Sequence, residues 1–214
     1  MCEKSIADFR RSGFLAASAL MLIAVTPAGA YSQEPSTQYV APAQAVPKGN
    51  APGMKVQLLS AGPSIKEYAV IFSTGDEALS GLLAFAQKYH VTSAHFTAIG
   101  GLSRGTVAWF DLQRKMFRKI PIDSQVEVVA MIGDIALDQG KPVVHTHMVV
   151  ATFDGTTRGG HVLEAYVSPT LEVMVTVDPI AMRKRLYPET GLSLIDPGLN
   201  AAAPAGAEIN PAAK

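Results

Sequence analysis

Cysteine is almost absent from this chain: the one cysteine is Cys2, which lies in a segment that we expect to be removed. A mature protein without cysteine forms no disulfide, so any bound metal must be held by histidine or carboxylate groups. An excess of charge of either sign is also missing, because 18 lysines and arginines balance 18 aspartates and glutamates. The longest basic run is Arg183-Lys184-Arg185. The sequence therefore lacks the electrostatic footprint of a nucleic-acid-binding protein.

The first 30 residues have the pattern of a cleavable export signal. Lys4, Arg10 and Arg11 form a basic start, residues 13–25 form an apolar core, and Ala28-Gly29-Ala30 fits the small-x-small cleavage rule. This core is shorter than the roughly 20 residues of a membrane span, although an uncleaved anchor is the alternative. We predict cleavage after Ala30, a periplasmic or secreted mature protein, and no membrane attachment after cleavage. The paired arginines come near the twin-arginine pattern, so the export route stays open.

Two proline-rich segments flank the part of the chain that we expect to fold. Residues 31–53 contain four prolines among small and polar residues. Such a composition buries too little apolar surface to offset its ordering entropy, so a flexible linker is predicted. Residues 198–214 are rich in alanine and proline and are predicted to form a disordered tail. The folded domain is therefore expected over residues 54–197, long enough for one hydrophobic core.

One helix is predicted directly after Ser73. Thr74 and Glu77 have the spacing of a capping box, in which the hydroxyl and the carboxylate each accept a hydrogen bond from the other residue's backbone N–H. Apolar residues follow at helical spacing and form one stripe, comprising Leu79, Leu82, Leu83, Ala86 and Tyr89. We interpret this stripe as the face that packs on the core.

The remaining segments have the period of β-strands. Strands are predicted over residues 54–59, 67–73, 91–99, 105–111, 116–120, 125–137, 143–150, 160–167 and 171–177. Gly100-Gly101 is expected to join two of them and to allow a positive φ or a close backbone approach, and Ser168-Pro169-Thr170 is expected to be a turn. The pattern predicts an α+β domain, mainly an antiparallel sheet of about seven or eight strands with one main helix packed on it.

Three of the five histidines lie on one predicted hairpin: His145, His147 and His161. Because side chains alternate along a strand, His145 and His147 project from the same face. Asp154-Gly155 is a strong hairpin signal, and a hairpin symmetric about Asp154 places His147 opposite His161. Opposed Cβ atoms lie about 5 Å apart, so the three imidazoles can converge on one point.

Three converging imidazoles with a fourth position left open are the ligand set of open zinc sites. We therefore predict a metal site at His145, His147 and His161, with zinc as the expected ion, although imidazole also suits copper, iron and nickel. The alternative is a set of ordinary half-buried strand histidines, which is how we interpret His90 and His95. No general base is evident, because Glu172 is expected about 13 Å along the strand from His161. Whether the chain is an enzyme stays open.

Several short motifs occur in a characteristic order along the domain. They are Ala98-Ile99-Gly100-Gly101-Leu102-Ser103, His145-x-His147, Asp154-Gly155, Gly159-Gly160-His161-Val162-Leu163-Glu164 and Leu171-Glu172-Val173. This order resembles the PPC domain family of prokaryotes and plants, over about residues 56–197. The resemblance implies a compact α+β subunit assembled as a homotrimer. It also implies a metal site formed by His145, His147 and His161.

Three functions are compatible with these features. The favoured one is an exported, zinc-binding homotrimer that binds or acts on an unidentified small molecule. A non-enzymatic interaction module with a structural metal is the alternative. DNA binding is the third, because prokaryotic relatives carry that label and plant relatives join the domain to AT-hook segments. This chain has no Arg-Gly-Arg-Pro core of such a hook and is close to neutral, so no nucleic-acid partner is expected.

Overall fold

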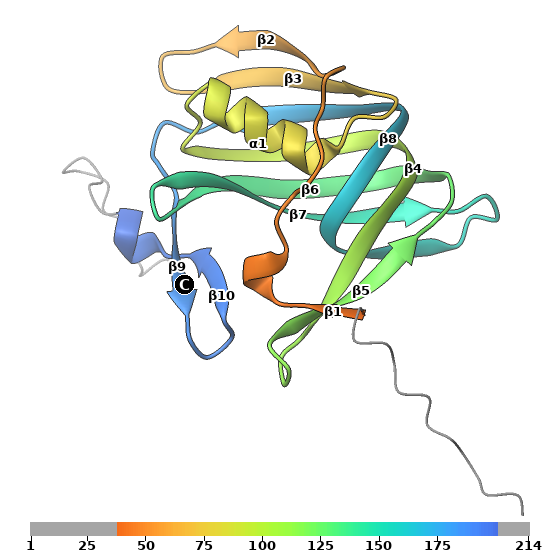
Figure 1. Cartoon of the computed structure of the whole chain (residues 1–214). Coiled ribbons are helices and arrows are strands. Elements are labelled where there is room, and N and C mark those ends of the chain that lie inside the picture. The colour runs from red at the N-terminus through yellow and green to blue at the C-terminus, as the bar shows by residue number, and fades with distance from the viewer. Residues whose placement is uncertain (1–37, 201–214) are drawn as a thin grey trace, which may run out of the picture. The chain divides into compact units, whose positions relative to one another are not determined.

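A computed structural model describes residues 38–200, and the structural statements below refer to these residues (Figure 1). The predicted signal sequence, residues 1–30, lies outside them, as do residues 201–214 of the predicted tail. Among the helices of the described residues, none has the length and apolar character needed to cross a membrane.

Within residues 38–200, one α-helix and a ten-stranded sheet make up the domain (Figure 1). The elements are β1 (Tyr39–Val40), η2 (Pro42–Gln44), β2 (Lys55–Ala61), β3 (Lys66–Ser73), α1 (Ala78–Lys88), β4 (Ser93–Asp111), β5 (Met116–Ile122), β6 (Val126–Asp138), β7 (Lys141–Ala151), β8 (Thr157–Val177), β9 (Arg183–Tyr187), β10 (Leu192–Ile195) and η3 (Pro197–Asn200).

The strands pair in the order β1-β5-β4-β6-β7-β8-β3-β2, with a further pairing between β4 and β8. β9 pairs with both β10 and β6. All of these pairings are antiparallel except the one between β6 and β9, which is parallel. The predicted α+β domain with one main helix is confirmed. The sheet is larger than predicted and is partly parallel.

α1 covers one face of the sheet (Figure 1). Its buried side includes Leu79, Leu82, Phe85 and Ala86, which belong to the same hydrophobic core as the inward-facing residues of the strands. The predicted stripe is therefore confirmed for Leu79, Leu82 and Ala86. Tyr89, which was assigned to the stripe, is the C-cap residue and is 37% exposed, and Phe85 fills the core instead.

The start of α1 differs from the predicted capping box. The N-cap residue is Glu77, whose carboxylate accepts hydrogen bonds from two backbone N–H groups of the first turn at 3.3 and 2.7 Å. Thr74 instead donates its hydroxyl hydrogen to the carbonyl oxygen of Pro169. The same carboxylate also accepts from the backbone N–H of Ala165 in β8, at 3.0 Å. This long-range contact ties the helix start to the sheet and has no signature in the local sequence.

β4 and β8 are long strands, each of which unites two predicted strands. The Gly100-Gly101 connection lies inside β4 next to a register shift. Gly100 has φ +148°, and a Cβ there would overlap the carbonyl oxygen of Thr170. The predicted close approach is confirmed, whereas the predicted break is wrong. The predicted turn at Ser168-Pro169-Thr170 is also wrong, because β8 continues through it while pairing with β3 and β4 on either side.

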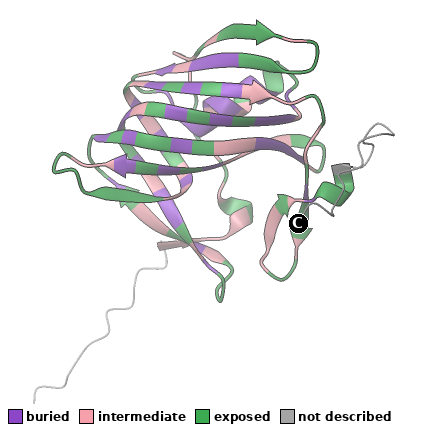
Figure 2. Ribbon diagram, turned by 180° about the vertical axis from the view of Figure 1, so that it is seen from behind, coloured by how far each residue is buried: buried purple, intermediate pink, exposed green. Residues whose placement is uncertain are grey.

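The face of the sheet that lies opposite α1, here called the outer face, is not covered by any helix formed by residues 38–200. Figure 2 shows buried and exposed residues alternating along its strands. Several of its exposed residues are apolar, namely Ile99, Val129, Ile132 and Met174. Together with Glu172, these residues line a shallow hollow. The outer face is therefore unusually apolar for a surface that faces solvent.

The second half of the predicted linker contacts the domain. β1 pairs with β5. The carbonyl oxygen of Asn50 accepts a hydrogen bond from the backbone N–H of Glu77 at 2.8 Å, and the backbone N–H of Gly53 donates to the Asp76 carboxylate at 2.8 Å. This segment therefore closes over the start of α1.

Candidate metal centre

β7 presents His145 and His147 on the outer face. The residue between them, Thr146, is buried on the core side and donates its hydroxyl hydrogen to the carbonyl oxygen of Ile132 at 2.8 Å. His145 pairs with Asp134 and His147 with Ile132 on the neighbouring strand β6. Because opposed residues project from the same face, these four side chains form one patch.

β8 supplies His161, which lies opposite His147 as the symmetric hairpin predicts. Gly160 has φ +156°, and a Cβ at this position would lie 2.5 Å from the carbonyl oxygen of Ala108 in β4. This close approach requires glycine. The ring of His161 stacks on Phe117 of β5, with 4.5 Å between ring centroids and an interplanar angle of 9°. The backbone approach and the aromatic neighbour together fix where His161 points.

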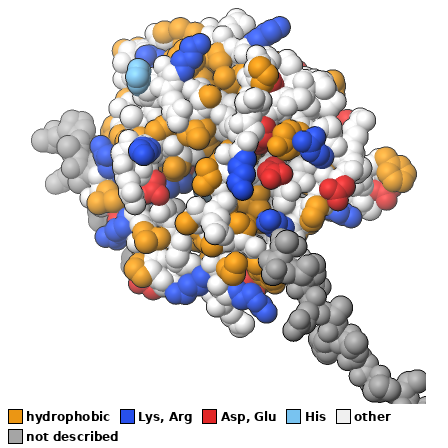
Figure 3. Space-filling model, in the orientation of Figure 1, with side chains coloured by type: hydrophobic (Ala, Val, Ile, Leu, Met, Phe, Trp, Pro, Cys, Tyr) orange, Lys and Arg blue, Asp and Glu red, His pale blue; other side chains and the backbone are white. Residues whose placement is uncertain are grey.

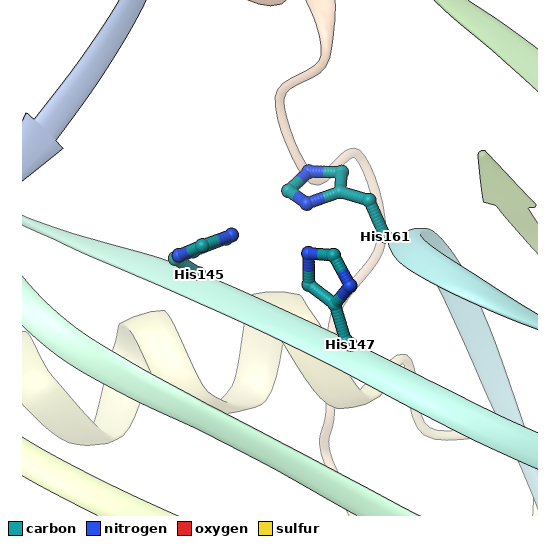
Figure 4. Close-up of side chains that lie close together, drawn as sticks. All are labelled: His145, His147 and His161. Carbon is teal, nitrogen blue, oxygen red and sulfur yellow. The ribbon is translucent and has the colours of Figure 1, made fainter. Parts of the chain in front are cut away.

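The three histidines converge as the sequence predicts. One ring nitrogen from each lies within 4.8 Å of the others, and the ring centroids are 5.2 to 5.3 Å apart. Figure 4 shows the nitrogens of the three rings directed at a shared space. Nitrogens around a tetrahedral zinc ion with bonds of 2.0 to 2.1 Å are about 3.4 Å apart. Small ring rotations bring this donor set to that geometry, so the residues fit a metal ion.

Burial and mutual repulsion keep two of these imidazoles neutral. Burial, followed by the nearby charges of His145 and His147, lowers the pKa of His161 to about 3. His147 is more exposed, but the partial burial of its ring, followed by the charge of His145, also lowers the pKa of His147 below its ordinary value of 6.5. A neutral imidazole is the form that binds a metal, so His147 and His161 are prepared for ligation at neutral pH.

A carboxylate lies behind the cluster. Asp134 Oδ2 is 3.1 Å from His145 Nδ1, and Asp134 Oδ1 is 3.2 Å from Lys184 Nζ. Burial alone raises the pKa of Asp134, but the hydrogen bond with His145 and the charges of Lys184 and His145 outweigh it and lower this pKa below its usual range. The Lys184 contact is an ion pair without hydrogen-bond alignment, since Oδ1 has no hydrogen-bond partner among the described residues.

Two residues of the site, Asp134 and Lys184, are not among those predicted from the sequence. The position of Asp134 could be predicted from the sequence, because a two-residue turn at Gln139-Gly140 places Asp134 opposite His145. The position of Lys184 could not, since Lys184 reaches the site through the parallel pairing of β9 with β6. The other two histidines stay outside the cluster, as expected, but both are exposed and not half-buried. His90 follows α1 and lies outside the strands, and His95 in β4 lies 3.5 Å from Asp178.

Glu172, considered as a general base, does not belong to the site. The absence of a turn in β8 places it opposite Ile71 and Ile99, in the hollow of the outer face. Its predicted position relative to His161 assumed a tight turn at residue 168 and is wrong.

The fold and the site define a class of protein: a sheet-rich α+β domain with a three-histidine cluster on its open sheet face. The sequence model of the Plants and Prokaryotes Conserved (PCC) domain matches residues 59–178. The chain therefore belongs to this family, which is the PPC family that its motifs resemble. No curated protein matches the chain.

Several solved structures share this fold. A PPC protein from Pyrococcus horikoshii is 24% identical with a TM-score of 0.58, and the match covers 66% of this chain and 94% of that one. A candidate DNA-binding protein from Ralstonia eutropha JMP134 is 31% identical with a TM-score of 0.59, covering 64% and 94%. A metal-containing protein from Archaeoglobus fulgidus is 22% identical with a TM-score of 0.57, covering 67% and 97%.

Proposed function

We propose that this chain is an exported metal-binding protein whose three-histidine site holds zinc and binds or acts on a small molecule. The observation that carries the proposal is the convergence of ring nitrogens from His145, His147 and His161 within 4.8 Å. The low pKa of His161, about 3, supports it, because this imidazole stays in its ligating form. The metal-containing relative from Archaeoglobus fulgidus gives independent support.

His145, His147 and His161 would hold zinc and leave one coordination position open, where the ion would supply polarisation of a bound small molecule or water. The protein's own residues would form the rest of the site. Phe117 shields one side of His161, and Asp134 holds the ring of His145. His147 is exposed at the open side of the cluster. A ligand would therefore approach from the outer face.

Cobalt substitution tests the open position. A Co²⁺ ion held by three histidines is expected to give the visible spectrum of tetrahedral cobalt, and small carboxylates or azide are expected to shift that spectrum by entering the fourth position. A spectrum that does not change when such anions are added would contradict the ligand-binding role. That outcome would favour the alternative, a non-enzymatic interaction module in which the metal only stabilises the fold.

DNA binding remains a further candidate because of the name of the Ralstonia eutropha relative. Figure 3 shows cationic and anionic side chains interspersed on the face that carries α1, and the whole chain has a net charge of +0. Such a surface gives little attraction to phosphates. A gel shift at about 0.15 M salt should therefore show no micromolar binding, and a shift at that concentration would overturn this expectation.

Export and assembly are part of the proposal. The basic start, apolar core and Ala28-Gly29-Ala30 of the sequence support a cleaved signal, so N-terminal sequencing of the secreted protein should begin at Tyr31. A mature protein that still begins at Met1 would contradict export. The exposed apolar residues of the outer face support a homotrimer, since exposed patches of this kind mark protein interfaces.

A further inference from the structure

Asp134 lies between a histidine of the cluster and a buried lysine. Its two carboxylate oxygens point in different directions, with Oδ2 at 3.1 Å from His145 Nδ1 and Oδ1 at 3.2 Å from Lys184 Nζ. The side chain of Lys184 is only 6% exposed and that of Asp134 is 21% exposed. A lysine buried to this degree needs an anionic partner, and the carboxylate of Asp134 meets that need.

The three residues come from three strands. His145 and Asp134 face each other across the β6–β7 hairpin, whereas Lys184 is on β9, which pairs with the end of β6. The family match ends at residue 178, so β9 and its lysine lie beyond it. A C-terminal strand of this chain therefore reaches the histidine cluster through one carboxylate.

The contact determines which nitrogen of His145 is free. With Nδ1 facing a carboxylate, the ring carries its hydrogen on Nδ1 and donates it to Asp134 Oδ2. Nε2 is then unprotonated and available to a metal. Carboxylates that accept from the second nitrogen of a ligating histidine fix its tautomer and orientation in metal sites generally.

We propose that Asp134 is the positioning residue for His145, and that Lys184 of β9 orients Asp134 by holding its other oxygen. The effect on metal affinity rests on the proposed function. The effect on the His145 tautomer does not, because it is a property of the metal-free protein.

Replacement of Asp134 by asparagine tests both contacts together. The ammonium of Lys184 attracts the amide oxygen of Asp134→Asn and repels its NH₂ group, so the oxygen would face Lys184 and the NH₂ group would face His145. A donor at this position forces the hydrogen of His145 onto Nε2, the nitrogen that the metal needs. In Asp134→Asn combined with Lys184→Met, the amide is free to turn its oxygen toward His145, and the original tautomer returns.

The first measurement is a long-range ¹⁵N–¹H correlation spectrum of the full metal-free chain. We expect His145 to be protonated on Nδ1 in the native protein, on Nε2 in Asp134→Asn, and again on Nδ1 in the double variant. An unchanged tautomer in Asp134→Asn would overturn the role of Asp134. A double variant that keeps the tautomer of Asp134→Asn would overturn the role of Lys184.

The second measurement is zinc affinity, by competition with a chromophoric chelator. Asp134→Asn should weaken binding about 10- to 100-fold, as expected for a lost partner of a ligand, and the double variant should regain most of that loss. Asp178→Asn is the matched control, because Asp178 contacts His95 outside the cluster, and it should leave the affinity unchanged. Equal losses in Asp134→Asn and Asp178→Asn would contradict the proposal.

The two readouts separate the proposal from the metal site itself. If the native protein binds no zinc, the proposed function fails, while the tautomers of His145 still decide the roles of Asp134 and Lys184. If zinc binds and the tautomers do not respond, the metal site stands and the positioning proposal fails. Should Asp134→Asn not fold because Lys184 has lost its anion, Lys184→Met alone decides the role of Asp134. The carboxylate of Asp134 still offers an acceptor to His145 in that variant, so the Nδ1 tautomer should be kept, and its loss would contradict that role.

Discussion

His161 is the most enclosed member of the cluster. Its ring stacks on Phe117, and its backbone is held by the close approach of Gly160 to Ala108. This enclosure explains why burial is the main cause of its low pKa. A ligand that is already neutral and already oriented loses little entropy when it binds a metal. His145 differs, because its orientation depends on a partner carboxylate.

The metal-free protein should become less stable as the pH decreases, because of His161. Its pKa is about 3 in the folded protein, against about 6.5 in the unfolded chain. Below about pH 6.5 the unfolded chain binds a proton that the folded protein does not, so the free energy of unfolding decreases by up to about 1.4 kcal/mol per pH unit until about pH 3. Above pH 6.5 this contribution is fully present and does not vary.

Urea unfolding of the metal-free protein between pH 7 and pH 4 measures this slope. His161→Gln, which cannot titrate, should show a shallower dependence than the native protein. Identical slopes for the two proteins would mean that His161 titrates normally in the folded state and would contradict the enclosure described above.

At the scale of elements, the approach of β8 to β4 places His161. Gly160→Ala would bring a Cβ to 2.5 Å from the carbonyl oxygen of Ala108, so the two strands would have to separate. We expect zinc affinity to fall by at least about tenfold, because the displaced backbone carries His161 away from its two partners.

Gly155→Ala is the matched control for this variant. Gly155 also has a positive φ, +79°, but a Cβ there would meet nothing within 4 Å. It should therefore cost about 1 kcal/mol of stability through backbone strain alone and leave zinc affinity nearly unchanged. If both variants bind zinc equally well, the β8–β4 approach does not position the site.

The start of α1 depends on Glu77. Its buried carboxylate accepts from two amides of the helix and from Ala165 of β8, so Glu77→Ala leaves three backbone donors, two of them buried, without this partner. We expect a loss of about 2 to 4 kcal/mol in the free energy of unfolding. Thr74→Ala removes only one exposed hydrogen bond and should cost less than about 1 kcal/mol. If urea unfolding shows equal losses of unfolding free energy in Glu77→Ala and Thr74→Ala, Thr74 would be the cap after all.

Local signals in the sequence predicted the elements that local interactions determine. The Asp154-Gly155 turn fixes the register of β7 and β8, so the opposition of His147 and His161 followed from it. The long strands β4 and β8 did not follow, because glycine and proline usually end strands and only pairing with strands distant in sequence carries the chain through them. The position of Lys184 depends on the parallel β6–β9 pairing in the same way.

At the scale of the whole molecule, the outer face makes assembly testable. Ile99 and Met174 are 61% and 46% exposed, and the proposed homotrimer would bury them. Ile99→Lys would place a charge in that interface, and we expect sedimentation velocity to show a shift from trimer to monomer. Leu58→Lys, at a 50% exposed position on β2, is the control and should remain a trimer. A native protein that sediments as a monomer would contradict the trimer.

Metal content measured on the purified full chain tests the central claim most directly. Prepared without chelators and analysed by mass spectrometry of the elements, the native protein should contain about one zinc ion per subunit, and His161→Gln should contain almost none. His95→Gln, which alters a histidine outside the cluster, should match the native protein. A native protein without metal, or a His161→Gln variant with the native content, would contradict the account.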